Sequence, residues 1–521
     1  MPEYLSPGVY VEEIEIGGKP IEGVSTSTAG FLGPTERGPE GPRLITGFEQ
    51  FRRLYGSYLA NSFLAYGVEG FFTNGGQRCF VGRIVADDAD ATSANVGAQI
   101  NIEAIGPGLW GNRIAVKVER GSLNSVATPL FKLTVMYWGQ TPPTPVVDPT
   151  NPANATNPNR REPDILEVYD NLTDDQSSIN YYENRINLQS SLVRIARVAA
   201  GLPADQALTL LADFGGAAAG TAGSALDLAD YQGRTLPTLP DGTTVRTGFL
   251  GFREIDEISI VVVPDHHAVT NLTTEIVTQC TQLKDRFAVL HSNPATDSLA
   301  TIGTLRPPQD TSYGAFYFPW IKVYDPRTKA DLLVPPSGHV AGIYAKTDIE
   351  RGVHKAPANE VVQGATSLQF QITKGEQDIL NPRGVNCMRV FPGRGLRVWG
   401  ARTSSSNPLL KYISVRRLLL YIEESIDEGT QWVVFEPNNE KLWGRVKATI
   451  TEFLTRVWRD GALMGLKPEE AFFVKCDRTT MTQDDIDNGR LICIIGVATV
   501  KPAEFVIFRI AQWAGGSAVT E

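Results

Sequence analysis

The apolar run "ISIVVV" at 258–263 restricts the fold of this chain more than any other feature. It does not alternate with polar residues, and it is far shorter than the roughly 18–20 apolar residues that cross a bilayer. Such runs are typical of strands buried on both faces of a parallel sheet. A helical pattern, "VTNLTTEIVTQCTQLKDRF", and a second strand pattern, "AVLHS", follow it. This β-α-β order predicts an α/β domain.

The same α/β pattern occurs in residues 25–94 and returns at 251, but a different pattern separates the two stretches. Residues 95–250 contain alternating antiparallel strand patterns, a proline-rich stretch at 139–163 and a glycine-rich stretch at 215–225. No regular element tolerates so many prolines, which indicates an exposed loop there. We therefore expect an inserted, β-rich domain on the outer surface.

The last third of the chain combines two long helical patterns with short strand patterns. The helices are "KYISVRRLLLYIEESIDEGTQW" and "NNEKLWGRVKATITEFLTRVWRDGAL", and the latter carries an apolar stripe at helical spacing. The chain as a whole is predicted to be an α/β and α+β multidomain protein. The expected parts are an N-terminal arm (1–24), the α/β domain (25–94 and 251–365), the inserted domain (95–250), a C-terminal α+β domain (366–502) and a C-terminal arm (503–521).

Composition argues against several classes of function. The net charge of −10 and the pI of about 5.3 argue against a general binder of nucleic acid or of anionic membranes. The five cysteines form no CxxC motif, which favours buried thiols in a reducing compartment. No basic, apolar leader pattern opens the chain, so we expect synthesis and folding in the cytosol.

Only one stretch invites a catalytic or metal-binding interpretation. Asp265, His266 and His267 follow the buried strand, at the end of a parallel sheet where α/β enzymes place their sites. A hydrolase would also need a serine or cysteine nucleophile, and no GxSxG motif is present. The five histidines show no HExxH spacing. We expect loop histidines, with no catalytic site, no metal and no cofactor.

Charge is strongly segregated near the start of the C-terminal domain. Eight basic residues and no acidic ones occur between Asn381 and Ile422, and "EESIDEG" (423–429) then supplies four acids. Such a module could meet a copy of itself, positive face to negative face. A solvated charged loop is the plainer alternative, and a nucleic-acid site is the third.

Both ends of the chain carry strand patterns without an obvious partner. "VYVEEIEI" (9–16) is followed by Gly17 and Gly18, and "EFVIFRI" (504–510) lies close to the C-terminus. An unpaired apolar strand is an aggregation hazard unless something covers it. It can fold back onto its own sheet or add to a sheet of a neighbouring chain. The patterns alone leave both options open.

Several long motifs, in order, resemble contractile tail sheath proteins of phages, tailocins and extracellular contractile injection systems. The resemblance covers roughly 1–85 and 315–512, and 95–250 has no counterpart in it. Its motifs are "YLSPGVYVEEI", "PIEGVSTSTAGFLGPTERGP", "DPRTKADLLVPPSGHVAGIYAKTDIERGVHKAPANE", "NPRGVNCMRVFPGRGLRVWGAR", "DEGTQWVVFEPNNEKLWGRV" and "GLKPEEAFFVKCDRTTMTQDDIDNGRLICIIGVATVKPAEFVIFRI".

The resemblance implies a structural role without catalysis. Sheath subunits stack as hexameric rings around an inner tube, above a baseplate, and contract to drive the tube through a target envelope. Further expected partners are terminator or cap proteins and paralogous sheath proteins, with no nucleic acid and no direct insertion into a membrane. Assembly would take place in the cytoplasm, and the subunit would end up in a virion tail or a released phage-tail-like particle. The α/β domain would be subtilisin-like in fold.

The resemblance also favours terminal arms that add strands to neighbouring subunits. The expected N-arm strand residues are Val9, Tyr10, Val11, Ile14 and Ile16, with Gly17 and Gly18 as the hinge. The expected C-arm strand residues are Phe505, Val506, Ile507, Phe508 and Ile510. The expected charged inter-subunit surface is Arg394, Arg397, Arg402, Arg416, Arg417, Glu423, Glu424, Asp427 and Glu428. Candidate tube-facing residues are Lys441, Arg445, Lys447, Arg456 and Arg459.

Two other classes of function stay open as alternatives. A non-contractile, self-assembling shell protein would share the arms but would lack a tube partner. A hydrolase on a subtilisin-like fold would require His266 or His267 for activity, and the missing nucleophile motif weighs against it.

Overall fold

Contacts within the chain divide it into two units, which are described separately. The computed structural model describes residues 20–238 and 242–509. The sheet unit comprises the described residues of 24–350 and 357–413. The C-terminal module comprises the described residues of 1–23, 351–356 and 414–521.

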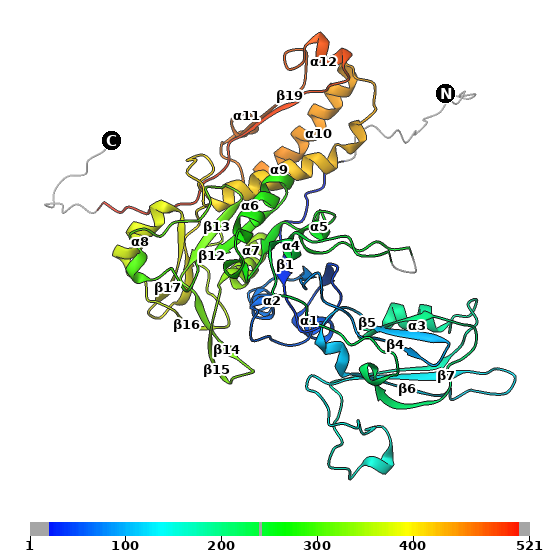
Figure 1. The fold of residues 1–521 in the computed structure, drawn as a ribbon. Helices are drawn as coiled ribbons and strands as arrows, with labels where there is room; N and C mark the ends of the chain where they lie inside the picture. The colour runs from blue at the N-terminus through cyan, green and yellow to red at the C-terminus, as the bar shows by residue number, and fades with distance from the viewer. Residues whose placement is uncertain (1–19, 239–241, 510–521) are drawn as a thin grey trace, which may run out of the picture. The chain divides into compact units, whose positions relative to one another are not determined.

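An eight-stranded sheet forms the centre of the sheet unit (Figure 1). Its order is β18-β17-β13-β12-β11-β1-β3-β2, and the six strands from β17 to β3 run parallel. The central position of β11 explains why "ISIVVV" is continuously apolar, since all three of its strand residues are buried. The strands are β1 (Ala29–Gly33), β2 (Arg43–Ile45), β3 (Cys79–Arg83), β11 (Ile260–Val262), β12 (Phe287–His291), β13 (Gly314–Phe318), β17 (Val385–Phe391) and β18 (Gly395–Trp399).

Helices connect the parallel strands, and two of them pack unusually closely. A Cβ atom on Gly338 of α7 would lie 2.3 Å from the carbonyl oxygen of Gly67 in α2, so glycine is required there. Small residues on this face of α7 thus allow the two helices to approach closely. The helices are α1 (Phe48–Tyr55), α2 (Leu64–Thr73), α4 (Leu228–Gln232), α5 (Gly248–Phe252), α6 (Leu272–Leu283), α7 (Ser337–Arg351) and α8 (Lys374–Leu380).

A small antiparallel sheet, β15-β14-β16, extends the sheet unit. Its strands are β14 (Ile321–Asp325), β15 (Ala330–Val334) and β16 (Ala365–Leu368). The apolar segment 313–326 contains both β13 and β14, which belong to different sheets. Pro319 lies between them, and it has no N–H with which to continue a ladder.

The chain between β3 and β11 builds two further sheets around a core of their own. One has the order β10-β6-β7-β8 and the other β4-β5-β9, and buried aliphatic and aromatic side chains such as Ile102, Trp110, Val135 and Tyr182 join them. The elements are β4 (Ser93–Val96), β5 (Ile100–Ala104), β6 (Ile114–Arg120), β7 (Phe131–Tyr137), β8 (Ile165–Leu172), α3 (Tyr182–Gln189), β9 (Val193–Arg197) and β10 (Gln206–Leu210).

The C-terminal module is built on two long helices that share one core. Tyr421 of α9 and Phe453 of α10 have ring centroids 5.9 Å apart, within a cluster that also contains Leu418, Val446 and Ile450. Burying each such side chain contributes about 1.5–3 kcal/mol. The elements are α9 (Ile413–Gly429), α10 (Glu440–Arg459), α11 (Pro468–Ala471), β19 (Phe472–Lys475), α12 (Gln483–Asp487) and β20 (Ile494–Val497).

Short 3-10 helices occur at several connections. They are η1 (Leu109–Arg113), η2 (Pro152–Asn154), η3 (Leu211–Asp213), η4 (His266–Ala268), η5 (Leu299–Thr301), η6 (Asn381–Arg383) and η7 (Gln431–Val433).

The predicted start of the C-terminal domain at 366 is wrong. Strand β17 pairs in parallel with β13, and β18 pairs with β17, so both belong to the main sheet. The sheet unit therefore continues to Ile413, and the C-terminal module resumes at Ser414. Pairing between β13 and β17 joins residues some seventy positions apart, and no local pattern reveals it.

The proline-rich stretch 139–163 is only partly the exposed loop that we expected. Val146 packs against Met136, Trp138 and their neighbours on one face of the four-stranded sheet. Asp148 forms an ion pair with Lys117 at 2.9 Å. Residues 151–159, in contrast, are almost all exposed.

We predict that deleting 151–159 leaves the fold intact. Arg160 already donates a hydrogen bond to the carbonyl of Pro149 at 3.1 Å, so the flanks of the deleted segment meet. The free energy of unfolding should change by less than about 0.5 kcal/mol, measured by thermal or urea denaturation. As a contrasting variant, Val146→Asp should lower it by about 1–3 kcal/mol, because a charge would replace a packed apolar side chain. A deletion variant that fails to fold would contradict this assignment.

Candidate assembly interface

The segment that follows β20 contains the most exposed run of apolar residues in the described chain. Phe505, Val506, Ile507 and Phe508 are 71%, 68%, 78% and 83% exposed, and residues 501–509 form no strand. Both faces of residues 505–508 are thus uncovered by the described residues, 20–238 and 242–509. Within that part of the chain, residues 505–508 pair with no strand, and Ile510 lies outside it.

The N-terminal arm itself lies outside the described residues, including Val9, Tyr10, Val11, Ile14, Ile16, Gly17 and Gly18. Its point of attachment is described. Ile21 is fully buried in the core of the C-terminal module, and Arg456 of α10 donates a hydrogen bond to the Ile21 carbonyl. A Cβ on Gly429, at the end of α9, would lie 2.6 Å from the Ile21 side chain. The arm therefore starts from a fixed position on α9 and α10.

The sheet nearest in sequence to the C-terminal arm is small. Strands β19 and β20 pair antiparallel, and they form a two-stranded sheet. Phe473 and Ile494 are 50% and 47% exposed. A two-stranded sheet with exposed apolar side chains is marginal by itself and is suited to accept further strands.

Three residues of the predicted charged inter-subunit surface are buried in the subunit. Arg402, Arg416 and Arg417 are 7%, 6% and 4% exposed. Arg402 donates to the carbonyl of Asn381 at 3.0 Å, and Arg416 pairs with Glu423 at 3.3 Å. These three arginines are interior groups, so the prediction that they lie on an exposed surface of the subunit is wrong.

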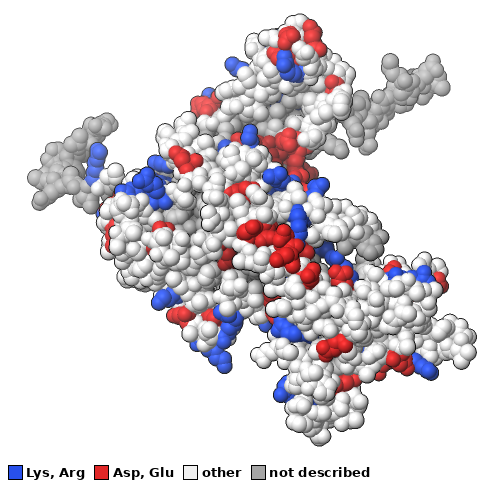
Figure 2. All heavy atoms as spheres, in the orientation of Figure 1, with Lys and Arg blue, Asp and Glu red and all other residues white. Residues whose placement is uncertain are grey.

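The remaining members of that set are accessible. Arg394 is exposed and lies over the rings of Phe391 and Trp399, at 5.7 and 5.9 Å from their centroids. Arg397 and Glu424 are half-buried, whereas Glu423, Asp427 and Glu428 on α9 are exposed. On the face drawn in Figure 2, basic and acidic side chains are interspersed rather than gathered in one basic field.

All five candidate tube-facing residues of α10 are exposed. At 3.6 residues per turn, four of them share one side of the helix: Lys441, Arg445, Arg456 and Arg459. Lys447 lies roughly 140° around the axis from these four, and its charge acts on Cys476 and Cys493 instead. The structure thus separates Lys447 from the other four.

The predicted loop histidines form a buried cluster with His291 at the ends of β11 and β12. His266 and His267 lie in η4, and the His266 and His291 ring centroids are 4.0 Å apart. The Nε2 atom of His266 accepts from the backbone N–H of His291 at 3.2 Å, and its Nδ1 lies 2.9 Å from the hydroxyl of Thr273. Trp320 packs against His267, with centroids 4.9 Å apart.

The electrostatics of this cluster favour neutral side chains. Burial lowers the pKa of His266 to about 3, and it also lowers the pKa of His267 and holds that of His291 well below its ordinary value. Burial raises the pKa of Asp265 to about 6. The Asp265 carboxylate accepts from the Ser62 hydroxyl at 2.8 Å and from the Phe63 N–H at 2.9 Å. Asp265 therefore orients a serine rather than a histidine, and the residues do not assemble a serine–histidine–aspartate relay.

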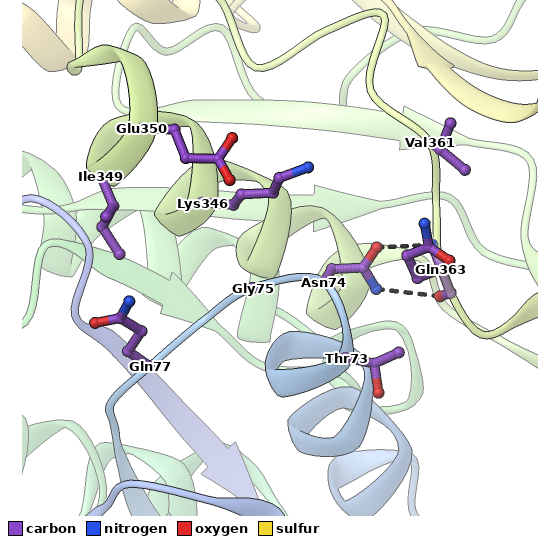
Figure 3. A pocket seen from close by; sticks show the side chains of 9 residues that line it. All are labelled: Thr73, Asn74, Gly75, Gln77, Lys346, Ile349, Glu350, Val361 and Gln363. Atoms are coloured by element: carbon purple, nitrogen blue, oxygen red, sulfur yellow. Dashed lines mark hydrogen bonds between the residues drawn. The ribbon is translucent and has the colours of Figure 1, made fainter.

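A pocket of about 320 Å³ lies where α2 ends beside α7 (Figure 3), and no motif in the sequence indicates it. The Asn74 side chain donates to the Gln363 carbonyl at 3.1 Å and accepts from the Gln363 N–H at 2.8 Å. The Lys346 ammonium lies 3.6 Å from the Glu360 carboxylate. These polar groups join the segment 360–363 to the two helices, which is a structural task.

A larger groove, of about 1210 Å³, lies between the α1 region and the inserted sheets. The Tyr137 ring is flanked by the guanidinium groups of Arg37 and Arg113, at 5.1 and 5.4 Å from its centroid. Its hydroxyl donates to Glu36 at 2.7 Å. Arg37 also donates to the carbonyls of Arg52 and Arg53 at the end of α1. These contacts attach the inserted sheets to the main sheet's helices.

Within residues 20–238 and 242–509, no group of three or more His, Cys, Asp or Glu side chains is placed to hold a metal ion. No helix there is long and apolar enough to cross a membrane.

Comparison with known proteins identifies the family. The model of the phage tail sheath protein central domain matches residues 242–404, and that of the phage tail sheath C-terminal domain matches 405–512. Together the two matched ranges cover more than half of the 521 residues. The chain belongs to the phage tail sheath family.

Curated relatives agree over part of their length. The tail sheath protein of Burkholderia phage BcepMu is 29% identical over 201 residues, which are 37% of this chain and 41% of that protein. The putative prophage major tail sheath protein of Pseudomonas aeruginosa is 26% identical over 204 residues, 37% of this chain and 51% of that protein. The chain thus spans about half the length, or less, of these curated relatives.

Solved structures resemble the whole chain in fold. The helical sheath of the anti-feeding prophage, in its contracted state, has a TM-score of 0.58 at 23% identity, covering 98% of this chain and 99% of that one. The PVC sheath complex of an extracellular contractile injection system, also contracted, has a TM-score of 0.57 at 22% identity, covering 99% of each. The predicted mixed α/β multidomain fold is confirmed, whereas its subtilisin-like character stays a prediction.

The histidine cluster predicts that stability falls in acid. Unfolded histidines titrate near pH 6.5, so the folded state binds fewer protons below that pH, and stability present above it is lost as the pH falls. Each histidine can contribute up to about 1.4 kcal/mol per pH unit. Asp265 acts in the opposite direction, because its raised pKa favours the protonated folded state below about pH 6.

Urea unfolding between pH 8 and pH 4 tests this balance. The free energy of unfolding should fall below pH 6.5, and the fall should be shallower in His267→Gln, which removes the least buried of the three imidazoles. In Asp265→Asn, the free energy of unfolding should fall below pH 6.5 at least as steeply as in the wild type. Identical slopes in the wild type and in His267→Gln would contradict the role given to the cluster.

Proposed function

We propose that this chain is the structural subunit of a contractile sheath. It polymerises as stacked hexameric rings around an inner tube and contracts to drive the tube through a target envelope. Membership of the tail sheath family supports the class, and the fold likeness to two sheaths solved in the contracted state is consistent with it. The observation that carries the assembly mechanism is the uncovered apolar segment 505–508 beyond β20.

Subunits are linked by β-augmentation from both termini. Residues 505–508 alternate as a strand does and are exposed on both faces among the described residues, so a neighbour's sheet is proposed to cover them. The N-terminal arm adds a second link, with Gly17 and Gly18 as its hinge. Main-chain ladders on flexible tethers survive rotation of the units that they join, and the energy difference between states lies in the surfaces that repack.

The accessible charges are candidates for those repacking surfaces. The exposed acids Glu423, Asp427 and Glu428 and the accessible arginines Arg394 and Arg397 carry opposite signs, which suits contacts between copies of the chain. The extended sheath persists because a kinetic barrier separates it from the contracted one.

The partners follow from this role. They are copies of the chain itself, an inner tube protein, baseplate and terminator or cap proteins, and paralogous sheath proteins. The subunit would assemble in the cytoplasm of the producing cell and leave it in a virion tail or a released particle. The parallel sheet of the sheet unit supports a subtilisin-like architecture that is used as a scaffold, without protease chemistry.

The basic side of α10 is the proposed contact with the tube. Lys441, Arg445, Arg456 and Arg459 share that side and are exposed. Arg445 is held over the Trp432 ring, with its guanidinium 4.4 Å from the ring centroid. Lys447, on another side of the helix, is not part of this surface.

We predict that removing either arm prevents long sheaths without unfolding the subunit. Deletion of 1–16 spares the buried Ile21, and deletion of 503–521 begins beyond β20, so both variants should stay soluble and folded by circular dichroism. Electron microscopy should show no long striated tubes. Phe505→Asp/Ile507→Asp and Val506→Asp/Phe508→Asp would show which face of the strand a neighbour covers.

Lys501→Ala, at an exposed position before the segment, is the matched control and should assemble normally. Normal sheaths from either truncated chain would refute the linking role of that arm.

We predict that charge reversal on α10 weakens binding to the tube. With a co-expressed inner tube protein of the same particle, Lys441→Glu/Arg459→Glu should lose most co-sedimentation with the tube while remaining folded, because both substitutions lie on the proposed contact side. Lys447→Glu changes charge on another side of the same helix and should retain binding. Equal loss in both variants, or no loss in the double variant, would remove α10 from the tube interface.

A further inference from the structure

Two cysteines lie side by side where β19 and β20 end. The strands pair from Phe472↔Val497 to Lys475↔Ile494, so the next pair along the ladder is Cys476 and Cys493. Each thiol also shifts the pKa of the other, which requires them to be close neighbours. We propose that Cys476 and Cys493 form an intramolecular disulfide that clamps β19 to β20 when the protein meets an oxidising thiol–disulfide medium.

The ladder gives this pair a spacing that a disulfide can bridge. Ala498 donates its N–H to the carbonyl of Ala471 at 2.8 Å, so that pair is hydrogen-bonded. Hydrogen-bonded and non-hydrogen-bonded pairs alternate along an antiparallel ladder, and this count assigns Cys476 and Cys493 to a non-hydrogen-bonded pair. Cα atoms in such pairs lie about 4.5 Å apart, within the range of about 4.4–6.8 Å found for disulfides.

Exposure distinguishes this pair from the other cysteines. Cys79, Cys280 and Cys387 are fully buried at 0% exposure and lie in different strands or helices of the sheet unit. Cys476 is 4% exposed, and Cys493 is the most accessible of the five. An oxidant that reaches the folded protein therefore meets Cys493 first, and its neighbour Cys476 is in place to resolve the product.

The charges near the two cysteines affect the rate of thiol–disulfide exchange and not its final product. Burial raises the pKa of Cys493 to about 12, and the nearby ammonium of Lys447 opposes that rise. Because the thiolate is the attacking species, exchange is slow at neutral pH and quickens as the pH rises. The inference holds for the isolated chain and does not depend on the proposed sheath function.

The reaction with a small-molecule disulfide such as oxidised glutathione balances in two exchange steps. The Cys493 thiol loses a proton, and its sulfur attacks one glutathione sulfur, which forms a mixed disulfide and releases glutathione thiolate. The Cys476 sulfur, after losing its proton, then attacks the Cys493 sulfur and displaces the second glutathione thiolate. The two protons end on the two glutathione molecules, the protein is oxidised by two electrons and the glutathione disulfide is reduced.

The cross-link closes the loop 477–492, which contains α12. Closing a loop removes conformations from the unfolded chain, so the oxidised protein should resist unfolding more than the reduced one. A reducing cytosol would keep the pair as thiols, and an oxidising exterior would close it.

The test uses the native, full-length chain with oxidised glutathione at pH 7 and pH 9. Free thiols should fall from five to three, and peptide mapping without reductant should join Cys476 to Cys493. The reaction should be several-fold faster at pH 9. The oxidised protein should melt at a higher temperature, and a reductant should reverse that shift.

Matched variants separate the cross-link from general oxidation. Cys476→Ser should stop at the mixed disulfide on Cys493, and Lys447→Ala should slow the wild-type reaction. Five surviving thiols after prolonged exposure at pH 9, a final product that keeps glutathione, or a cross-link between other cysteines would each overturn the proposal. Because the mapping is done on the wild type, a variant that fails to fold leaves the test decisive.

Discussion

The six parallel strands at the centre of the sheet unit determine how the rest of that unit is connected. Parallel neighbours cannot be joined by tight turns, so every connection must leave the sheet and cross back over it. The step from β3 to β11 skips over β1, and the chain uses that crossover to build the two inserted sheets. The inserted domain has its own core and lies before the range matched by the two sheath family models. A crossover that is self-supporting in this way can differ between relatives without disturbing the strands that carry it.

Local patterns predicted most of the elements but not all of their partners. The run at 258–263, the helices α6, α9 and α10 and the antiparallel strands of the insertion were predicted because period and burial agree within each segment. The membership of β17 and β18 in the main sheet was missed, because it depends on a pairing between residues distant in sequence. The segment 504–510 has a strand pattern, yet its described part forms no strand. A β-ladder forms only where a second strand is available for pairing, and the pattern of one segment does not show where that strand lies.

The candidate interface was harder to predict than the fold. Arg402 and Arg416 were expected on an inter-subunit surface because basic residues are segregated in this stretch, yet each is buried with hydrogen-bonding or charged partners. The histidines at 266 and 267 were expected in a loop, and their packing against His291 and Trp320 joins residues of three separate segments. Lys447 was grouped with the other cations on the polar side of the predicted helix, although 3.6 residues per turn already place it on another side. Exposure and the direction of a side chain are properties of the packed chain, and composition does not report them.

The buried attachment of Ile21 has a mechanical meaning. In the proposed assembly, tension on the N-terminal arm reaches the subunit first at Ile21, where the side chain is held against Gly429 and the carbonyl is held by Arg456. The load passes directly into α9 and α10, whose shared core resists shear along its whole length. The same helix that receives the pull also presents the proposed tube-facing side chains. In that assembly, a displacement of one ring would be transmitted through α9 and α10 to the side chains proposed to face the tube.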